Sequence, residues 1–96
     1  MTEVMTREMG FTHQQLLRIL PNAAAGRPCH MEATQVVIEA GEGRTVTVVL
    51  EPEQVRKIAS ISLPQTTVHF KFAGFEGGEA DAEMDRLFIH FHKGGG

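Results

Sequence analysis

The sequence predicts an α+β fold made of an N-terminal helix, a four-stranded antiparallel meander and a C-terminal helix, with both helices on one face of the sheet. Three patterns indicate this fold. A helix-start signal lies at 12–16, apolar and polar residues alternate through 66–72, and apolar residues recur at helical spacing through 80–91. Short connections between the predicted strands favour pairing of sequence neighbours, as in a meander.

The first helix is predicted to begin near Thr12. Thr12 and Gln15 form a T-x-x-Q capping box, in which each side chain accepts a hydrogen bond from the other residue's backbone amide. Phe11 and Leu16 occupy the two positions of a hydrophobic staple, which fixes the angle at which the chain enters the helix. We expect the helix to end at Pro21, because proline disfavours the helical conformation of the residue before it.

The middle of the chain predicts a hairpin and a strongly alternating strand. Thr34–Ala40 and Arg44–Leu50 are rich in β-branched residues and flank Gly41-Glu42-Gly43, whose glycines suit a tight turn. In Thr66–Phe72 apolar residues alternate with polar ones, which gives the strand one buried and one exposed face.

The segment Val55–Leu63 is compatible with two structures. Its apolar residues alternate with Ser60 and Ser62, which favours a strand, whereas the residues just before it suit the start of a short helix. The strand is taken as the third in the predicted meander, and Pro64-Gln65 is expected to turn the chain into the fourth.

The last element is predicted to be a helix. From Ala80, apolar residues recur at i, i+4, i+7, i+8 and i+11, which places them on one helical face. Leu87–His92 taken alone also suits a strand, but the helical period reaches back to Ala80 and favours the helix. The apolar face consists of Ala80, Met84, Leu87, Phe88 and Phe91.

The chain length of 96 residues fits one domain. Residues 1–10 show no usable period and are expected to form a flexible tail, residues 11–93 a single α+β domain, and residues 94–96 a flexible glycine tail. A core of this size leaves little room for a deep internal cavity, so a ligand site is expected on the surface or between subunits.

Composition and charge argue against several classes of function. The net charge is −3 and the basic residues are scattered, whereas a nucleic-acid binder usually gathers them on one face. No apolar stretch reaches the ~20 residues of a membrane span, and the polar start of the chain does not fit a signal peptide. One cysteine, Cys29, cannot form an internal disulfide. We therefore expect a soluble protein of a bacterium-like cytoplasm, with no cofactor and no nucleic-acid or membrane partner.

The residues that could carry chemistry are Cys29, His30, His90 and His92. Cys29 and His30 with a distant histidine could bind a metal or form a nucleophile–base pair, but no second cysteine or spaced histidine completes a zinc set. His90 and His92 would share a face on a strand, whereas on the predicted helix they lie ~200° apart. A small buried thiol and polar surface histidines explain both pairs more simply.

The three C-terminal glycines, Gly94–Gly96, are similar to the diglycine end of ubiquitin-like carrier proteins. That resemblance implies activation of the C-terminal carboxylate, because a glycine tail can thread a narrow enzyme channel. The element order expected here differs from the ββαββ order of those carriers, and glycines after Lys93 also suit the end of a helix. A carrier function is therefore kept as an alternative.

The leading interpretation is a non-enzymatic interaction or ligand-binding module that works as a homodimer or binds another protein. A four-stranded sheet with helices on one face leaves its second face and its edges uncovered. Val37 and Val49 are predicted to lie on that second face, as are His69 and Lys71 of the alternating strand. These four residues are the candidate binding residues.

Overall fold

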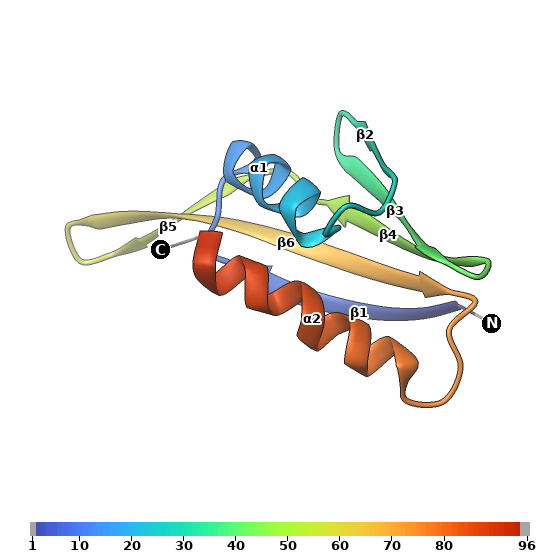
Figure 1. Ribbon diagram of the computed structural model, residues 1–96. Coiled ribbons are helices and arrows are strands. Elements are labelled where there is room, and N and C mark those ends of the chain that lie inside the picture. The colour runs from blue at the N-terminus through green and yellow to red at the C-terminus, as the bar shows by residue number, and fades with distance from the viewer. Residues whose placement is uncertain (1, 95–96) are drawn as a thin grey trace.

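The computed structural model describes residues 2–94 and shows an antiparallel sheet with two helices (Figure 1). Its elements in chain order are β1 (Thr2–Met9), α1 (His13–Ala23), β2 (Cys29–Glu32), β3 (Gln35–Gly41), β4 (Arg44–Leu50), β5 (Gln54–Ile58), β6 (Ile61–Ala73) and α2 (Glu79–Gly94). The strands lie in the order β1-β6-β4-β3-β2, and β5 pairs with the first residues of β6. The α+β class is confirmed. The four-stranded meander is only partly matched, since residues 2–94 form six strands and β6 lies between β1 and β4.

Residues 2–9 form β1 where the sequence predicts a flexible tail. The strand pairs antiparallel with β6 along its whole length, from Thr2 opposite Ala73 to Met9 opposite Thr66. Only Met5 and Met9 pack against the core, and their neighbours are exposed at the edge of the sheet. Backbone pairing therefore holds this strand with little apolar burial, and no period is visible in its sequence. The predicted glycine tail falls largely on residues 95–96, which lie outside the described residues, while Gly94 ends α2.

The segment 55–63 forms a hairpin and not a single strand. β5 ends at Ile58, a two-residue turn follows at Ala59 and Ser60, and β6 begins at Ile61. Ala59 takes φ +54°, a left-handed conformation that hairpin turns require but that usually selects glycine or asparagine, so the sequence does not announce this turn. The turn expected at Pro64-Gln65 is also absent. β6 runs through Pro64, which a strand tolerates at a sheet edge.

Helix α1 starts as predicted and continues further than predicted. The capping box is present, with Gln15 N–H donating to Thr12 Oγ1 over 3.1 Å and Thr12 N–H donating to the Gln15 side chain over 2.8 Å. The helix continues through Pro21 to Ala23. Leu20 and Ala23 are fully buried, so their packing outweighs the backbone hydrogen bond that proline cannot make.

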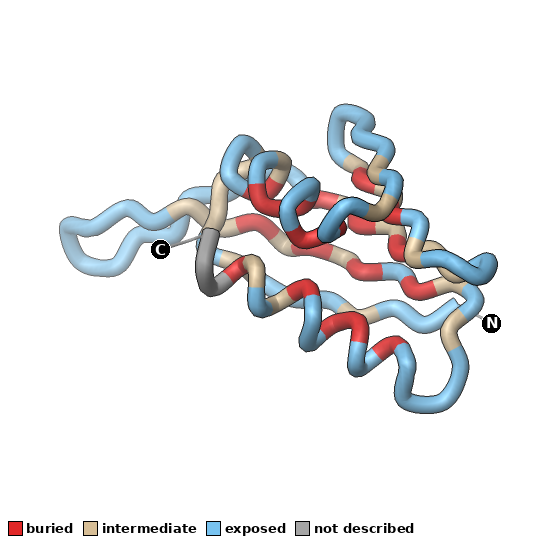
Figure 2. Tube along the Cα trace, in the orientation of Figure 1, coloured by how far each residue is buried: buried red, intermediate tan, exposed pale blue. Residues whose placement is uncertain are grey.

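Both helices contribute to one hydrophobic core on one face of the sheet (Figure 2). α2 confirms the helical period and excludes a strand at 87–92. Phe70 lies at the centre, where the rings of Phe88 and Phe91 meet it edge-on with centroids 6.1 and 6.2 Å away. The buried strand residues are alternate ones: Val36, Ile38, Val46, Val48, Leu50, Thr66, Val68, Phe70 and Phe72.

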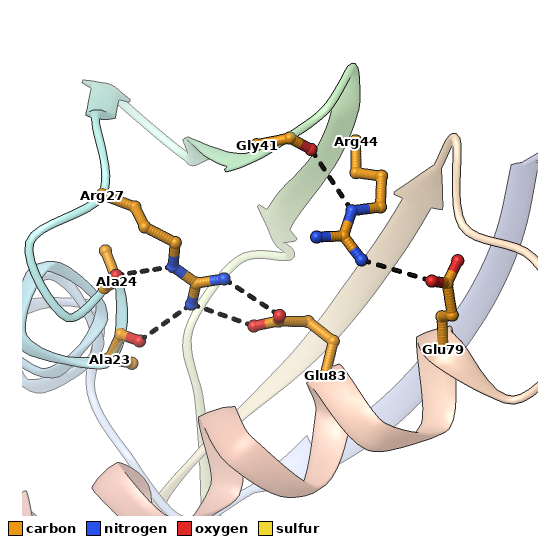
Figure 3. Close-up of polar contacts among 7 residues, drawn as sticks. All are labelled: Ala23, Ala24, Arg27, Gly41, Arg44, Glu79 and Glu83. Atoms are coloured by element: carbon orange, nitrogen blue, oxygen red, sulfur yellow. Dashed lines mark hydrogen bonds and ion pairs between the residues drawn. The ribbon is translucent and has the colours of Figure 1, made fainter.

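A buried ion pair joins the two helices (Figure 3). Arg27, which follows α1, donates from both terminal nitrogens to the carboxylate of Glu83 in α2, each over 2.9 Å. The same guanidinium donates to the carbonyls of Ala23 and Ala24, which end α1. One side chain therefore caps α1 and fixes α2 against it. A second pair, between Arg44 and Glu79, is longer at 3.4 Å and more exposed.

Candidate functional site: the open face and the hairpin arm

The sheet has a second face that neither helix of the described chain covers, here called the open face. Side chains alternate along a strand, so the neighbours of each core residue point to this face. Five of its side chains are small β-branched residues that are half-buried in the sheet: Val37, Thr45, Thr47, Val49 and Thr67. The face also includes Val4, Thr6, Glu8, His30, Glu39, His69 and Lys71.

The four candidate binding residues all lie on the open face. The strand register places Val37 opposite Thr47 and Thr47 opposite Lys71, so these three form one row across the sheet. In the next row Val49 lies directly opposite His69. The sequence alone predicted the shared face, and the pairing register adds which residues are neighbours.

A chain of hydrogen bonds crosses the open face at His69. The Thr6 hydroxyl lies 2.9 Å from His69 Nδ1, and the carboxylate of Glu51 lies 2.5 Å from His69 Nε2. A hydroxyl, an imidazole and a carboxylate in this order also occur in nucleophilic sites, where backbone donors must surround the attacked group as well. Here the three side chains tie β1 and β6 to the segment after β4. Sequence reasoning missed the contact because Thr6 was not expected in a strand.

The same segment is anchored to the start of α1. The backbone N–H of His13 donates to the Glu53 carboxylate over 2.6 Å, and the His13 ring bonds the Glu51 carbonyl over 2.6 Å. Buried Thr66 donates from its hydroxyl to the Phe11 carbonyl over 2.8 Å. These contacts fix the point where β5 leaves the body of the protein.

Beyond that point β5 and the start of β6 project as a two-stranded hairpin, here called the hairpin arm (residues 54–65). It extends past both helices at the left of Figure 1 and is pale blue for most of its length in Figure 2, which marks exposed residues. Four large apolar side chains on it are 44–65% exposed: Val55, Ile58, Ile61 and Leu63. Ile58, Ile61 and Leu63 share one face of the hairpin, whereas Val55 lies on the other. An isolated two-stranded hairpin is at best marginally stable in water, and clustered exposed apolar residues such as these three indicate a contact surface.

A shallow pocket of about 320 Å³ joins the hairpin arm to the end of β1. Its lining comes from residues 8–10 on one side and from 56, 58 and 63–65 on the other. Arg56 lines the pocket, and with Lys57 it forms the only pair of adjacent Lys or Arg residues in the sequence. The apolar surface of the arm is therefore continuous with β1 and has a basic border.

The structure separates Cys29 from His30. Cys29 lies opposite buried Ile38 and packs against the core, whereas His30 lies opposite Val37 on the open face. Partial burial raises the pKa of the Cys29 thiol above its usual value, which disfavours the reactive thiolate. His30 pairs instead with Glu39, 2.9 Å away. These two residues therefore do not converge on one centre.

The second pair of candidate residues, His90 and His92, belongs to α2. His90 lies on the helix, and the side chain of His92 lies outside the described part of the structure. Two helical residues two positions apart point in different directions. Among the described side chains, no group of three or more His, Cys, Asp or Glu residues is placed to hold a metal ion. The carrier alternative rests on residues 95–96, which are outside the described range, and stays a prediction.

The fold and the site define an α+β protein with one covered sheet face, one open sheet face and a projecting hairpin. The chain matches no protein-family model, no curated protein and no solved structure. Neither helix within residues 2–94 combines the length and the apolar character that crossing a bilayer demands. Inference about function therefore starts from the open face, the hairpin arm and β1.

Proposed function

We propose that this chain is a non-enzymatic interaction module that works as a homodimer. The observation that carries the proposal is the hairpin arm, whose apolar side chains Ile58, Ile61 and Leu63 are exposed on an element without a core of its own. Burying such side chains is favourable by about 25 cal/mol per Å² of apolar surface removed from water. A partner surface is the means by which a folded chain removes them from water.

Charge favours a second copy as the partner. The arm carries Arg56 and Lys57, while α2 presents Asp81 and Asp85 as exposed acidic residues on its surface. One molecule therefore has both a basic apolar projection and an acidic helix surface, with exposed Ile89 on that helix. Complementary charges of this kind steer association and fix orientation.

The test is sedimentation equilibrium of the whole chain at micromolar concentration. We expect a reversible dimer, and a monomer at every concentration would overturn the proposal. Ile61→Ser should weaken the dimer because it removes an exposed apolar side chain from the arm. Met31→Ser is the control, since Met31 is 52% exposed and lies on β2, which belongs neither to the arm nor to the acidic surface of α2.

Equal weakening by both substitutions would show that general surface hydrophobicity, and not the arm, causes association. Circular dichroism of each variant checks that the fold is unchanged. Both side chains are exposed, so neither substitution opens a cavity in the core.

A further inference from the structure

Strand β1 has one free edge. Within residues 2–94 it pairs only with β6, and its other side has no strand beside it. Natural proteins protect such edges with prolines, bulges, very short strands or charged side chains, and of these β1 has only the charged residues Glu3, Arg7 and Glu8. β1 has eight residues, contains no proline, and pairs with β6 in an unbroken register. Its free side is therefore long and regular enough to accept another strand.

Two of the three charged residues of β1, Glu3 and Arg7, lie symmetrically about Met5. Glu3 lies two positions before Met5 and Arg7 two positions after it, so all three point to the same face of the sheet. When two copies of the strand pair antiparallel with Met5 opposite Met5, each Glu3 lies opposite the second copy's Arg7. Directly opposite side chains of opposite charge stabilise a strand pair.

Other registers lose this match. Centring the pair on Glu3 opposes two carboxylates, and centring it on Arg7 opposes two guanidinium groups. Centring it on Val4 or Thr6 leaves Met5 opposite one of the two charged residues. In the remaining registers no residue lies opposite its own copy. These registers turn the second copy's strand over, so that its core-facing side chains lie on the other face of the joined sheet. The charge pattern therefore selects one register.

We infer that two copies of this chain join through antiparallel pairing of their β1 strands, centred on Met5, so that one continuous sheet runs through both copies. The inference rests on the proposed homodimer and names its interface. In the single chain, the Arg7 guanidinium donates to the carbonyl of Thr6 over 2.8 Å. In the inferred dimer this contact is lost, and Arg7 pairs with Glu3 of the second copy. Val4, which is 53% exposed on the open face, comes to lie opposite the second copy's Thr6.

This interface is continuous with the hairpin arm. The shallow pocket between β1 and the arm is lined by Glu8 and Met9 on its β1 side. Pairing of the β1 strands brings the second copy's chain to this end of β1, next to the apolar side chains of the arm. Main-chain hydrogen bonds then supply affinity and the arm supplies apolar contact.

The experiment is charge exchange on the full chain, read by sedimentation equilibrium. Glu3→Arg opposes two arginine pairs across the interface, and Arg7→Glu opposes two glutamate pairs. Each variant alone should dimerise at least about tenfold more weakly, which corresponds to about 1.4 kcal/mol. An equimolar mixture of the two variants should form a heterodimer. One copy then carries two positive charges at positions 3 and 7 and the other carries two negative charges, so both cross-strand pairs join opposite charges.

The double variant E3R/R7E should also dimerise like the original chain. Within one strand, residues 3 and 7 are about 13 Å apart, so contact inside a monomer cannot explain such a recovery. Glu32→Arg is the matched control. It makes the same charge change at an exposed position of β2, the strand at the opposite edge of the sheet, so its dimer should be unaffected.

The outcomes separate the inference from the proposed function. A wild-type monomer overturns both. A wild-type dimer that neither single substitution weakens overturns the β1 interface and leaves the homodimer in place. Weakening by both substitutions without recovery in the mixture or the double variant overturns the Met5-centred register. Recovery in both, with the dimer of Glu32→Arg unchanged, supports the inference.

Discussion

The two faces of the same sheet differ in what covers them. In β6, Phe70 and Phe72 are fully buried beneath the helices, while His69 and Lys71, which flank Phe70, lie on the open face. The chain thus places its large apolar residues on one face and small β-branched and polar residues on the other. The hairpin arm departs from this rule, because its large apolar residues have no cover within the described chain. That departure, and not the open face as such, is the observation on which the proposed homodimer rests.

A similar contrast separates the two arginine–glutamate pairs (Figure 3). Arg27 and Glu83 have side chains that are 15% and 8% exposed and share two hydrogen bonds of 2.9 Å. Arg44 and Glu79 share one contact of 3.4 Å at a more exposed position. Burial makes the first pair sensitive to loss of either partner, whereas solvent screens the second.

The largest expected effect tests the contrast between the faces. Phe70→Ala should lower the free energy of unfolding by about 4 kcal/mol, because it leaves a cavity at the centre of the core. Lys71→Ala, one residue away on the open face, should change it by less than about 0.5 kcal/mol. Urea unfolding followed by circular dichroism measures both, since the chain has no Trp or Tyr to report by fluorescence. Similar losses at both positions would contradict the assignment of the faces.

The next effect tests the contrast between the ion pairs. Glu83→Ala should cost about 3 kcal/mol because it leaves a largely buried guanidinium without its carboxylate. Glu79→Ala should cost less than about 1 kcal/mol. The same unfolding measurement compares them. Replacing Arg27 and Glu83 together by Met and Leu should recover much of the loss, and an equally unstable double variant would show that the pair is not the cause.

The smallest effect concerns Cys29. Its pKa is raised by burial, so the folded chain holds the thiol proton more tightly than the unfolded chain does. Stability from this group is complete below the unfolded pKa of about 8.5 and is lost as pH rises through the higher folded value. Unfolding measured across this alkaline range should show a decline that Cys29→Ser removes. An identical decline in both proteins would assign it to other groups.

The sequence predicted the elements whose burial follows a regular period. Alternation at Val68, Phe70 and Phe72 located the core part of β6, and the recurrence from Ala80 to Phe91 located α2. Elements held mainly by backbone pairing were missed. β1 and β2 lie at the two edges of the sheet, so few of their side chains are buried and their apolar pattern is weak.

Local signals also failed where packing overrides them. Pro21 does not end α1, because the buried residues around it hold the helix against the core. The turn at Ala59 has no glycine or asparagine to indicate it. For the site, the alternation rule placed His69 and Lys71 on one face, but the contact of His69 with Thr6 and Glu51 depends on long-range pairing that no local pattern contains.

Strand β6 belongs to both the body and the hairpin arm, and this has a consequence for local unfolding. Between Val68 and Ala73 it is bonded on both sides, by β1 and by β4, whereas from Ile61 to Gln65 only β5 pairs with it. Amide hydrogens of one strand should therefore exchange with solvent at very different rates, slowly in its second half and quickly in its first. The arm can open and close while the sheet stays intact, and slowing of exchange confined to 54–65 would report that a partner has bound there.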